Sequence, residues 1–196
     1  MTTPLAALTN HQVRLAARPE GLPKASDWQH TSEPVAEPGD GGVLVKTLMI
    51  SLDPAMRGWM NEGTGVQEYA LFAADQVKRS GMFKIDTRLG TPSQWLNVLG
   101  MPGMTGYFGL MDVGQPKTGE TVVVSGAAGA VGQTVGQLAK IKGCRVVGIA
   151  GGAAKCAWVV KELGFDACID YKAGPVKDGL KEHCPSGIDI YFDNVG

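Results

Sequence analysis

The stretch Thr121–Gly132, which reads TVVVSGAAGAVG, decides the fold class of this chain. It opens with the continuous apolar run Thr121–Ser125, which is typical of a parallel strand covered on both faces. A glycine-rich turn follows at once, and residues 130–142 then place apolar side chains at helical spacing. A strand, a glycine-rich turn and an amphipathic helix in this order predict the first unit of a dinucleotide-binding sheet.

The rest of the C-terminal half continues to alternate strand and helix with short connections. The sequence predicts strands at Arg145–Ile149, Ala167–Ile169 and Ile188–Asp193, and helices at Ala153–Leu163 and Val176–His183. Strict alternation of this kind implies a parallel sheet with crossover helices. We therefore expect an α/β fold, with a Rossmann-type parallel sheet of which these are the first four strands.

The chain before this sheet has a different texture. Short β-prone runs occur at Gln12–Ala16, Gly42–Met49 and Gln67–Phe72, and prolines and glycines separate them. This pattern predicts a small, mostly antiparallel barrel or sheet.

The glycine-rich turn has the spacing of a dinucleotide fingerprint. In the G-x-G-x-x-G frame, Ala127 takes the first place, Gly129 the second and Gly132 the third. The second glycine lets the main chain approach a pyrophosphate, and the third lets the helix pack closely on the strand. The helix N-terminus then offers free N–H groups and a partial positive charge to phosphates. The setting between strand and helix favours a dinucleotide site over the alternative, a tight turn without a ligand.

The choice of dinucleotide depends on the residues that follow the second strand. Sites for NAD usually place Asp or Glu about 20 residues after the glycine turn, where it holds the ribose 2′-hydroxyl. No acidic residue occurs between Glu120 and Glu162, whereas Lys155 follows the second strand closely enough to meet a 2′-phosphate. The alternative for Lys155 is a solvated lysine in the first turn of a helix. Together, the missing acid and this lysine favour NADP over NAD.

Composition and charge exclude several other classes of protein. A formal net charge of −1, with no dense run of Lys and Arg, argues against nucleic-acid binding. No window is apolar for long enough to span a bilayer, and Met1–Asn10 lacks the features of a signal peptide, so we expect a cytoplasmic protein. The four cysteines form no C-x-x-C pair and the three histidines stand at no zinc-ligand interval, so no metal site is expected.

Several longer motifs resemble one family, the zinc-free medium-chain reductases. Within it the sequence is most similar to the group of prostaglandin reductases, leukotriene B4 12-hydroxydehydrogenases and alkenal double-bond reductases. The resemblance covers nearly the whole chain. Besides the glycine turn, it rests on Ser51–Gly58 (SLDPAMRG), Gly103–Tyr107 (GMTGY), Gly114–Glu120 (GQPKTGE), Gly148–Cys156 (GIAGGAAKC), Gly164–Asp166 (GFD), Asp170–Lys172 (DYK) and Asp193–Gly196 (DNVG).

This resemblance implies a partial GroES-like substrate domain at residues 1–103, followed by the N-terminal part of an NADP-binding Rossmann domain at residues 104–196. It implies an enzyme that transfers hydride from NADPH to the carbon–carbon double bond of an enal or enone, a small-molecule substrate. The coenzyme residues that it implies lie in the glycine turn, after the second and third strands, after the fourth strand, and beside the nicotinamide: Ala128, Gly129, Ala130, Val131, Gly132; Lys155, Tyr171; Asn194; Thr105.

The sequence also departs from the family pattern. The match jumps at Glu62–Gly65, where the family has further barrel strands, and the chain stops at Gly196, just after the fourth strand. We therefore expect a truncated and internally deleted version of a longer reductase, which in full length is expected to form a homodimer. Two alternatives remain open: a fragment that binds NADP without catalysis, and an NADPH:quinone reductase on the same scaffold.

No catalytic residue follows from the sequence. The hydroxyls of Tyr69 and Tyr107 are available as hydrogen-bond donors, but we expect both side chains to be packing aromatics. Asp53 and Arg57 are expected to form a structural ion pair in the barrel.

Overall fold

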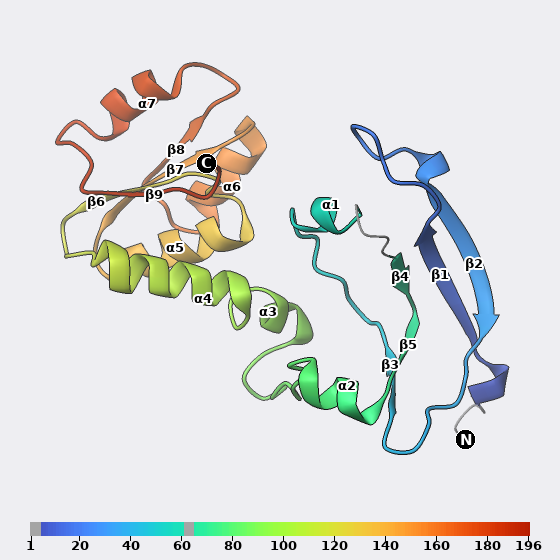
Figure 1. Cartoon of the computed structure of the whole chain (residues 1–196). Coiled ribbons are helices and arrows are strands. Elements are labelled where there is room, and N and C mark those ends of the chain that lie inside the picture. The colour runs from blue at the N-terminus through green and yellow to red at the C-terminus, as the bar shows by residue number, and fades with distance from the viewer. Residues whose placement is uncertain (1–4, 61–64) are drawn as a thin grey trace. The chain divides into compact units, whose positions relative to one another are not determined.

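The computed structural model describes residues 5–60 and 65–196 of the chain (Figure 1). The chain divides into two compact units, Met1–Ile85 and Asp86–Gly196. The domain border that the sequence analysis placed at residue 103 stays a prediction, because a border between domain families need not coincide with a border between compact units.

The first unit contains two small antiparallel sheets. One has the order β2-β1-β4, with β1 at Thr9–Leu15, β2 at Trp28–Pro34 and β4 at Gly65–Gln67. The other pairs β3 (Val43–Lys46) with β5 (Tyr69–Phe72). The antiparallel character expected from the sequence is confirmed. Four short helices accompany these strands: η1 (Leu5–Ala7), η2 (Ala25–Asp27), α1 (Met56–Trp59) and α2 (Ala74–Arg79).

A buried amide holds the two sheets of this unit together. Asn10 on β1 is 9% exposed, and its side chain both donates to and accepts from the backbone of Tyr69, at 2.9 Å in each case. Its Nδ2 also donates to Oε1 of Gln67, at 3.2 Å. Because a buried amide without partners costs free energy, this satisfied side chain fixes the start of β5 against β1.

The expected ion pair between Asp53 and Arg57 is wrong. The Arg57 guanidinium donates to the carbonyl oxygens of Pro19 and Gly21, both at 3.1 Å. Asp53 accepts the backbone N–H of Ala55 at 2.9 Å instead. Each side chain therefore stabilises a backbone segment. The Asp53 carboxylate binds the backbone at the start of α1, and the Arg57 guanidinium binds the loop before η2.

The second unit contains the predicted parallel sheet. Its strands are β6 (Thr121–Val124), β7 (Arg145–Ala150), β8 (Ala167–Asp170) and β9 (Ile190–Phe192), and all neighbours run parallel in the order β8-β7-β6-β9. The strand order reverses between β6 and β9. In open parallel sheets, a ligand binds at such a reversal, outside the carboxyl ends of the strands.

Helices cover both faces of this sheet. Figure 1 shows α7 (Val176–His183) on one side and α5 (Ala130–Ile141) on the other. Adjacent strand residues point to opposite faces. Val122 and Val124 accordingly pack in the core beneath α5, whereas Val123 packs in the second core with residues of α7. Helix α6 (Ala153–Lys161) shares the α5 face and contributes a fully buried Val159.

A helical segment before the sheet was not predicted from the sequence. It comprises α3 (Pro92–Leu96), α4 (Met101–Phe108) and the π-helical turn η3 (Gly109–Gly114). Gly106 allows α4 to approach α5 closely, because a Cβ there would lie 3.2 Å from Cγ2 of Val135. Leu110 of η3 is fully buried in the core beneath α5. These residues therefore belong to the packing of the second unit.

Candidate functional site

A cleft of about 640 Å³ lies at the carboxyl ends of the parallel strands. The turn after β6, the end of β7, the first turn of α6 and the residues that follow β8 and β9 line it. Of the residues that the sequence singled out, Ala128, Gly129, Lys155 and Tyr171 line this cleft. The structure thus brings together the glycine turn and the two residues expected at the 2′-phosphate end.

The glycine turn begins one residue earlier than the fingerprint frame suggests. Gly126 has a φ of +56°, a left-handed conformation that favours glycine, whereas Ala127, assigned to the first glycine place, is fully buried. The N–H of Gly129 donates to the Gly126 carbonyl at 2.8 Å and closes the turn. A Cβ on Gly132 would collide with that same carbonyl and lie 2.9 Å from the Ala127 Cα. The helix consequently packs directly on the turn.

The N-terminus of α5 opens at this turn without a side-chain cap. Its N-cap is Gly129, which has no side chain to accept a hydrogen bond from the first-turn N–H groups. Uncapped N–H groups at the start of a helix bind anions through hydrogen bonds and the helix dipole. Gly129 itself borders the cleft, so the uncapped N-terminus of α5 opens there.

A second uncapped helix terminus lies at the end of β7. Helix α6 has Gly152 as its N-cap, again with no side-chain hydrogen bond, and exposed Lys155 stands in its first turn. Tyr171, which follows β8, donates its backbone N–H to the Ala150 carbonyl at 3.2 Å. Its ring lies against the backbone of Gly151. A cation, a phenol and a helix N-terminus therefore border one end of the cleft.

One carboxylate stands near this end, but backbone groups already hold it. Oδ1 of Asp170 accepts the N–H of Gly152 at 2.7 Å and the N–H of Lys172 at 2.9 Å. These two hydrogen bonds lower the pKa of the Asp170 carboxyl, the bond from Gly152 contributing most. Asp170 thus braces the turn between β7 and α6 as an ionised acceptor.

A polar network joins the ends of β6 and β9 at the opposite end of the cleft. The hydroxyl of Ser125, which is 5% exposed, donates to Oδ1 of Asp193 at 2.6 Å and accepts the N–H of Asn194 at 2.7 Å. The Asn194 amide also donates to the Ser125 carbonyl at 3.0 Å. Hydrogen bonds from the Ser125 hydroxyl and then from the Val195 N–H lower the pKa of the Asp193 carboxyl. Sequence reasoning missed Ser125 and Asp193; a polar residue ending an apolar strand was the available signal.

The remaining residues from the sequence analysis are not among those that line the cleft. Ala130, Val131 and Gly132 follow Gly129 as the first turn of α5, and Asn194 stands between Asp193 and Val195, which both line the cleft. Thr105 lies on α4, where its hydroxyl donates to the Met101 carbonyl at 2.8 Å.

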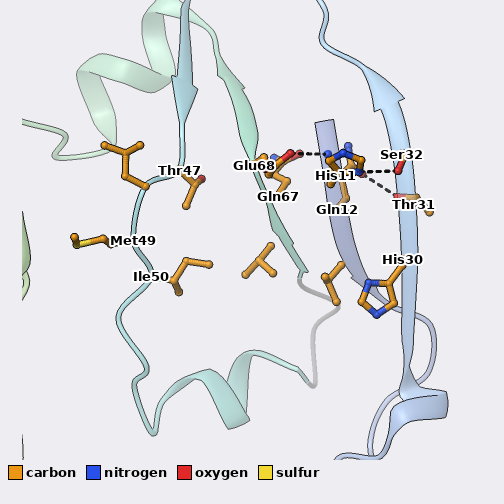
Figure 2. A pocket seen from close by; sticks show the side chains of 13 residues that line it. His11, Gln12, His30, Thr31, Ser32, Thr47, Met49, Ile50, Gln67 and Glu68 are labelled. Atoms are coloured by element: carbon orange, nitrogen blue, oxygen red, sulfur yellow. Dashed lines mark hydrogen bonds between the residues drawn. The ribbon is translucent and has the colours of Figure 1, made fainter. Parts of the chain in front are cut away.

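The first unit has a separate hollow of about 530 Å³ between its two sheets. Figure 2 shows His11 between Ser32 and Glu68; its Nδ1 lies 2.9 Å from the Ser32 hydroxyl, and its backbone N–H donates to Glu68 at 3.4 Å. The apolar side chains of Met49 and Ile50 face the same space. Strands β1, β2 and β4, Glu68 and residues 47–50 after β3 line this hollow.

Within residues 5–60 and 65–196, no three His, Cys, Asp or Glu side chains come close enough to hold a metal ion. No helix there combines the length and apolar character needed to cross a bilayer.

The fold is that of a Rossmann-type unit preceded by a partial GroES-like domain. Residues 11–80 match the family described as the N-terminal domain of oxidoreductase, and residues 130–196 match the zinc-binding dehydrogenase family. The chain belongs to the medium-chain dehydrogenase/reductase family.

Named relatives and solved structures agree with this membership. The NADPH-dependent curcumin reductase of Escherichia coli (strain K12) is 41% identical over 95% of this chain and 64% of its own length. The NADP(+)-dependent 2-alkenal reductase of Nicotiana tabacum is 37% identical over 96% of this chain and 66% of its own length. The crystal structure of CurA from Vibrio vulnificus in complex with NADPH matches with a TM-score of 0.80, at 38% identity, over 95% of this chain and 65% of CurA.

The chain is shorter than these relatives. It spans about two thirds of their length or slightly less, and the match to the Escherichia coli protein extends over 225 residues, 29 more than this chain has. That relative therefore has residues inside the matched region with no counterpart here. The deletion expected at Glu62–Gly65 falls largely on residues 61–64, which lie outside the described part of the chain.

Proposed function

We propose that this chain binds NADP(H) in the cleft of the parallel sheet and serves an NADPH-dependent reductase. The observation that carries the proposal is that Lys155, after β7, and Tyr171, after β8, line one cleft, while the sequence has no acidic residue from Thr121 to Lys161. An NAD site would require a carboxylate there for the ribose 2′-hydroxyl. Asp170, the last residue of the neighbouring strand β8, already accepts two backbone N–H groups through its Oδ1.

The residues of the cleft fit the parts of a dinucleotide. The turn from Gly126 and the N-terminus of α5 suit the pyrophosphate, because uncapped N–H groups and close backbone approach both favour it. Lys155 and Tyr171 suit a 2′-phosphate, since a cation and a phenol both interact with its oxygens. In this proposal Ala128, Gly129, Ala130, Val131 and Gly132 contact the pyrophosphate, and Asn194 and Thr105 serve the nicotinamide end.

The proposed reaction is reduction of the carbon–carbon double bond of α,β-unsaturated aldehydes or ketones. The bound coenzyme supplies the hydride, and the chain supplies binding and orientation. Hydride addition at the β-carbon builds negative charge on the carbonyl oxygen, which a hydrogen-bond donor must stabilise. We assign no residue of this chain to that donor. The names of the curcumin and 2-alkenal reductases among the relatives support this substrate class.

Replacing Lys155 tests the 2′-phosphate assignment. We expect Lys155→Ala to weaken NADPH binding about tenfold or more, because a hydrogen bond to a charged group contributes about 1.5–3 kcal/mol. NADH binding is expected to stay within about twofold, since NADH has no phosphate at this position. Equilibrium titration followed by nicotinamide fluorescence measures both affinities.

Lys161 provides the matched control for this substitution. It is an exposed lysine in the last turn of the same helix, away from the cleft, so Lys161→Ala should bind both coenzymes as the parent does. An equal loss of NADPH and NADH affinity in Lys155→Ala would contradict the assignment. With binding established, NADPH consumption with a 2-alkenal supports the proposed reaction, a preference for quinones supports the quinone reductase, and binding without turnover supports the non-catalytic alternative.

A further inference from the structure

We infer that Gly151 is a specificity-determining residue of the coenzyme site, because its missing side chain makes the space that the Tyr171 ring takes up in the cleft that Lys155 also lines. The inference rests on the proposed function, since it concerns the choice of NADPH over NADH at the same cleft. All three residues line that cleft. In this view the absence of a side chain on Gly151 leaves room for the aromatic ring of Tyr171.

The contact between Tyr171 and Gly151 leaves no room for a methyl group. A Cβ on Gly151 would lie 2.5 Å from the Tyr171 hydroxyl oxygen, 2.6 Å from Cζ and 2.9 Å from Cε1. Favourable separations between such atoms are about 3.5–4.0 Å. The ring therefore packs directly on the backbone of Gly151.

Backbone conformation does not account for this glycine. Gly151 is absent from the glycines with positive φ, so an alanine there meets no backbone strain. The next residue behaves in the opposite way, because Gly152 has a φ of +101° and open space where its Cβ would stand. Gly152 thus allows the backbone conformation of the turn, whereas Gly151 leaves room for the Tyr171 ring.

The backbone of Tyr171 is held in place, so its side chain has to yield to an added methyl. The Tyr171 N–H donates to the Ala150 carbonyl at 3.2 Å, and Asp170 ties the residues on either side of this contact together through Gly152 and Lys172. The Tyr171 side chain can move toward solvent, since the residue is 54% exposed. A methyl on Gly151 would therefore rotate the ring into solvent and leave the backbone where it is.

Losing the ring affects the two coenzymes differently. The phenol hydroxyl is a hydrogen-bond donor in the cleft that Lys155 also lines, and these two groups form the proposed partners of the 2′-phosphate. NADH carries a hydroxyl in place of that phosphate, so it depends less on both groups. A displaced ring consequently lowers the preference for NADPH while the pyrophosphate part of the cleft stays intact.

A double-mutant cycle on the intact chain tests this inference by titration with NADPH and NADH. We expect Gly151→Ala to weaken NADPH binding about tenfold, the loss of one charged hydrogen bond, and NADH binding by less than about twofold. Tyr171→Ala should give a similar loss. The double variant should bind NADPH no more weakly than Tyr171→Ala alone, because the methyl then has no ring to displace.

The controls separate a local effect from a loss of folding. Gly174→Ala adds a methyl in the same loop as Tyr171, where a Cβ meets open space, and should bind like the parent. Circular dichroism and thermal unfolding report the folded state of each variant. If Gly151→Ala fails to fold and the double variant folds, the clash with the ring is upheld; if the double variant also fails to fold, the inference is wrong.

The outcomes distinguish this inference from the proposed function. Additive losses in the double variant, or equal losses of NADPH and NADH affinity in Gly151→Ala, would overturn the inference. A parent chain that binds NADPH and NADH equally would instead overturn the proposed function. A parent preference for NADPH that Gly151→Ala leaves unchanged would overturn the inference alone.

Discussion

Gly132→Ala is expected to weaken NADPH binding about 100-fold, because about two hydrogen bonds to the charged pyrophosphate would be lost, each contributing about 1.5 kcal/mol. The methyl would strike the Gly126 carbonyl and lie 2.9 Å from the Ala127 Cα, and both of these are backbone atoms. Backbone that closes a tight turn cannot rotate away as a side chain can. The turn and the N-terminus of α5 would have to separate, and the pyrophosphate subsite would separate with them.

Titration with both coenzymes measures this effect. NADH should lose as much affinity as NADPH, since both carry the pyrophosphate; this distinguishes Gly132→Ala from the variants of Lys155 and Gly151. Gly174→Ala, which meets open space, again provides the control. Unchanged NADPH affinity in a folded Gly132→Ala protein would contradict the placement of the pyrophosphate at this turn.

Phe165→Ala is expected to lower the free energy of unfolding of the second unit by about 3–5 kcal/mol. Phe165 is 2% exposed, and its ring fills the space over two glycines, Gly136 of α5 and Gly148 of β7. Neither glycine has a side chain that could move into the cavity. The loss should therefore lie in the upper part of the range observed for large-to-small core substitutions.

Urea unfolding followed by circular dichroism checks this prediction. Tyr171→Ala is the matched control, because it removes an aromatic ring that is 54% exposed, and it should cost less than about 1 kcal/mol. A loss below about 1 kcal/mol in Phe165→Ala would show that the glycines collapse around the cavity and that this contact is not central to the packing.

Much of the second unit could be predicted from local sequence patterns. β6 is a continuous apolar run because both of its faces are covered, and its turn carries glycines because the helix packs directly upon it. The strand expected at Ile188–Asp193 is shorter, Ile190–Phe192, because the following residues bond to the side chain of Ser125 instead of extending the ladder. Strand borders set by side chains distant in sequence leave no local signal.

The site was only partly predictable for the same reason. Lys155 followed from its position after a strand without an acidic residue, which is a local feature. The contact of Tyr171 with Gly151 joins the residues that directly follow β8 and β7, and the pairing of these two strands brings them together. The start of the glycine turn lies one residue earlier than predicted. The fingerprint spacing assigned its first place to Ala127, whereas Gly126 takes the left-handed conformation.

The most direct test of the account is an equilibrium titration of the unmodified chain with NADPH and, separately, with NADH. The cleft offers Lys155, Tyr171 and an uncapped helix terminus to a 2′-phosphate, and Oδ1 of Asp170 already accepts two backbone N–H groups. We predict that NADPH binds at least about tenfold more tightly than NADH, as the loss of one charged hydrogen bond requires. Equal affinities, or tighter binding of NADH, would contradict the assignment of this cleft to NADP.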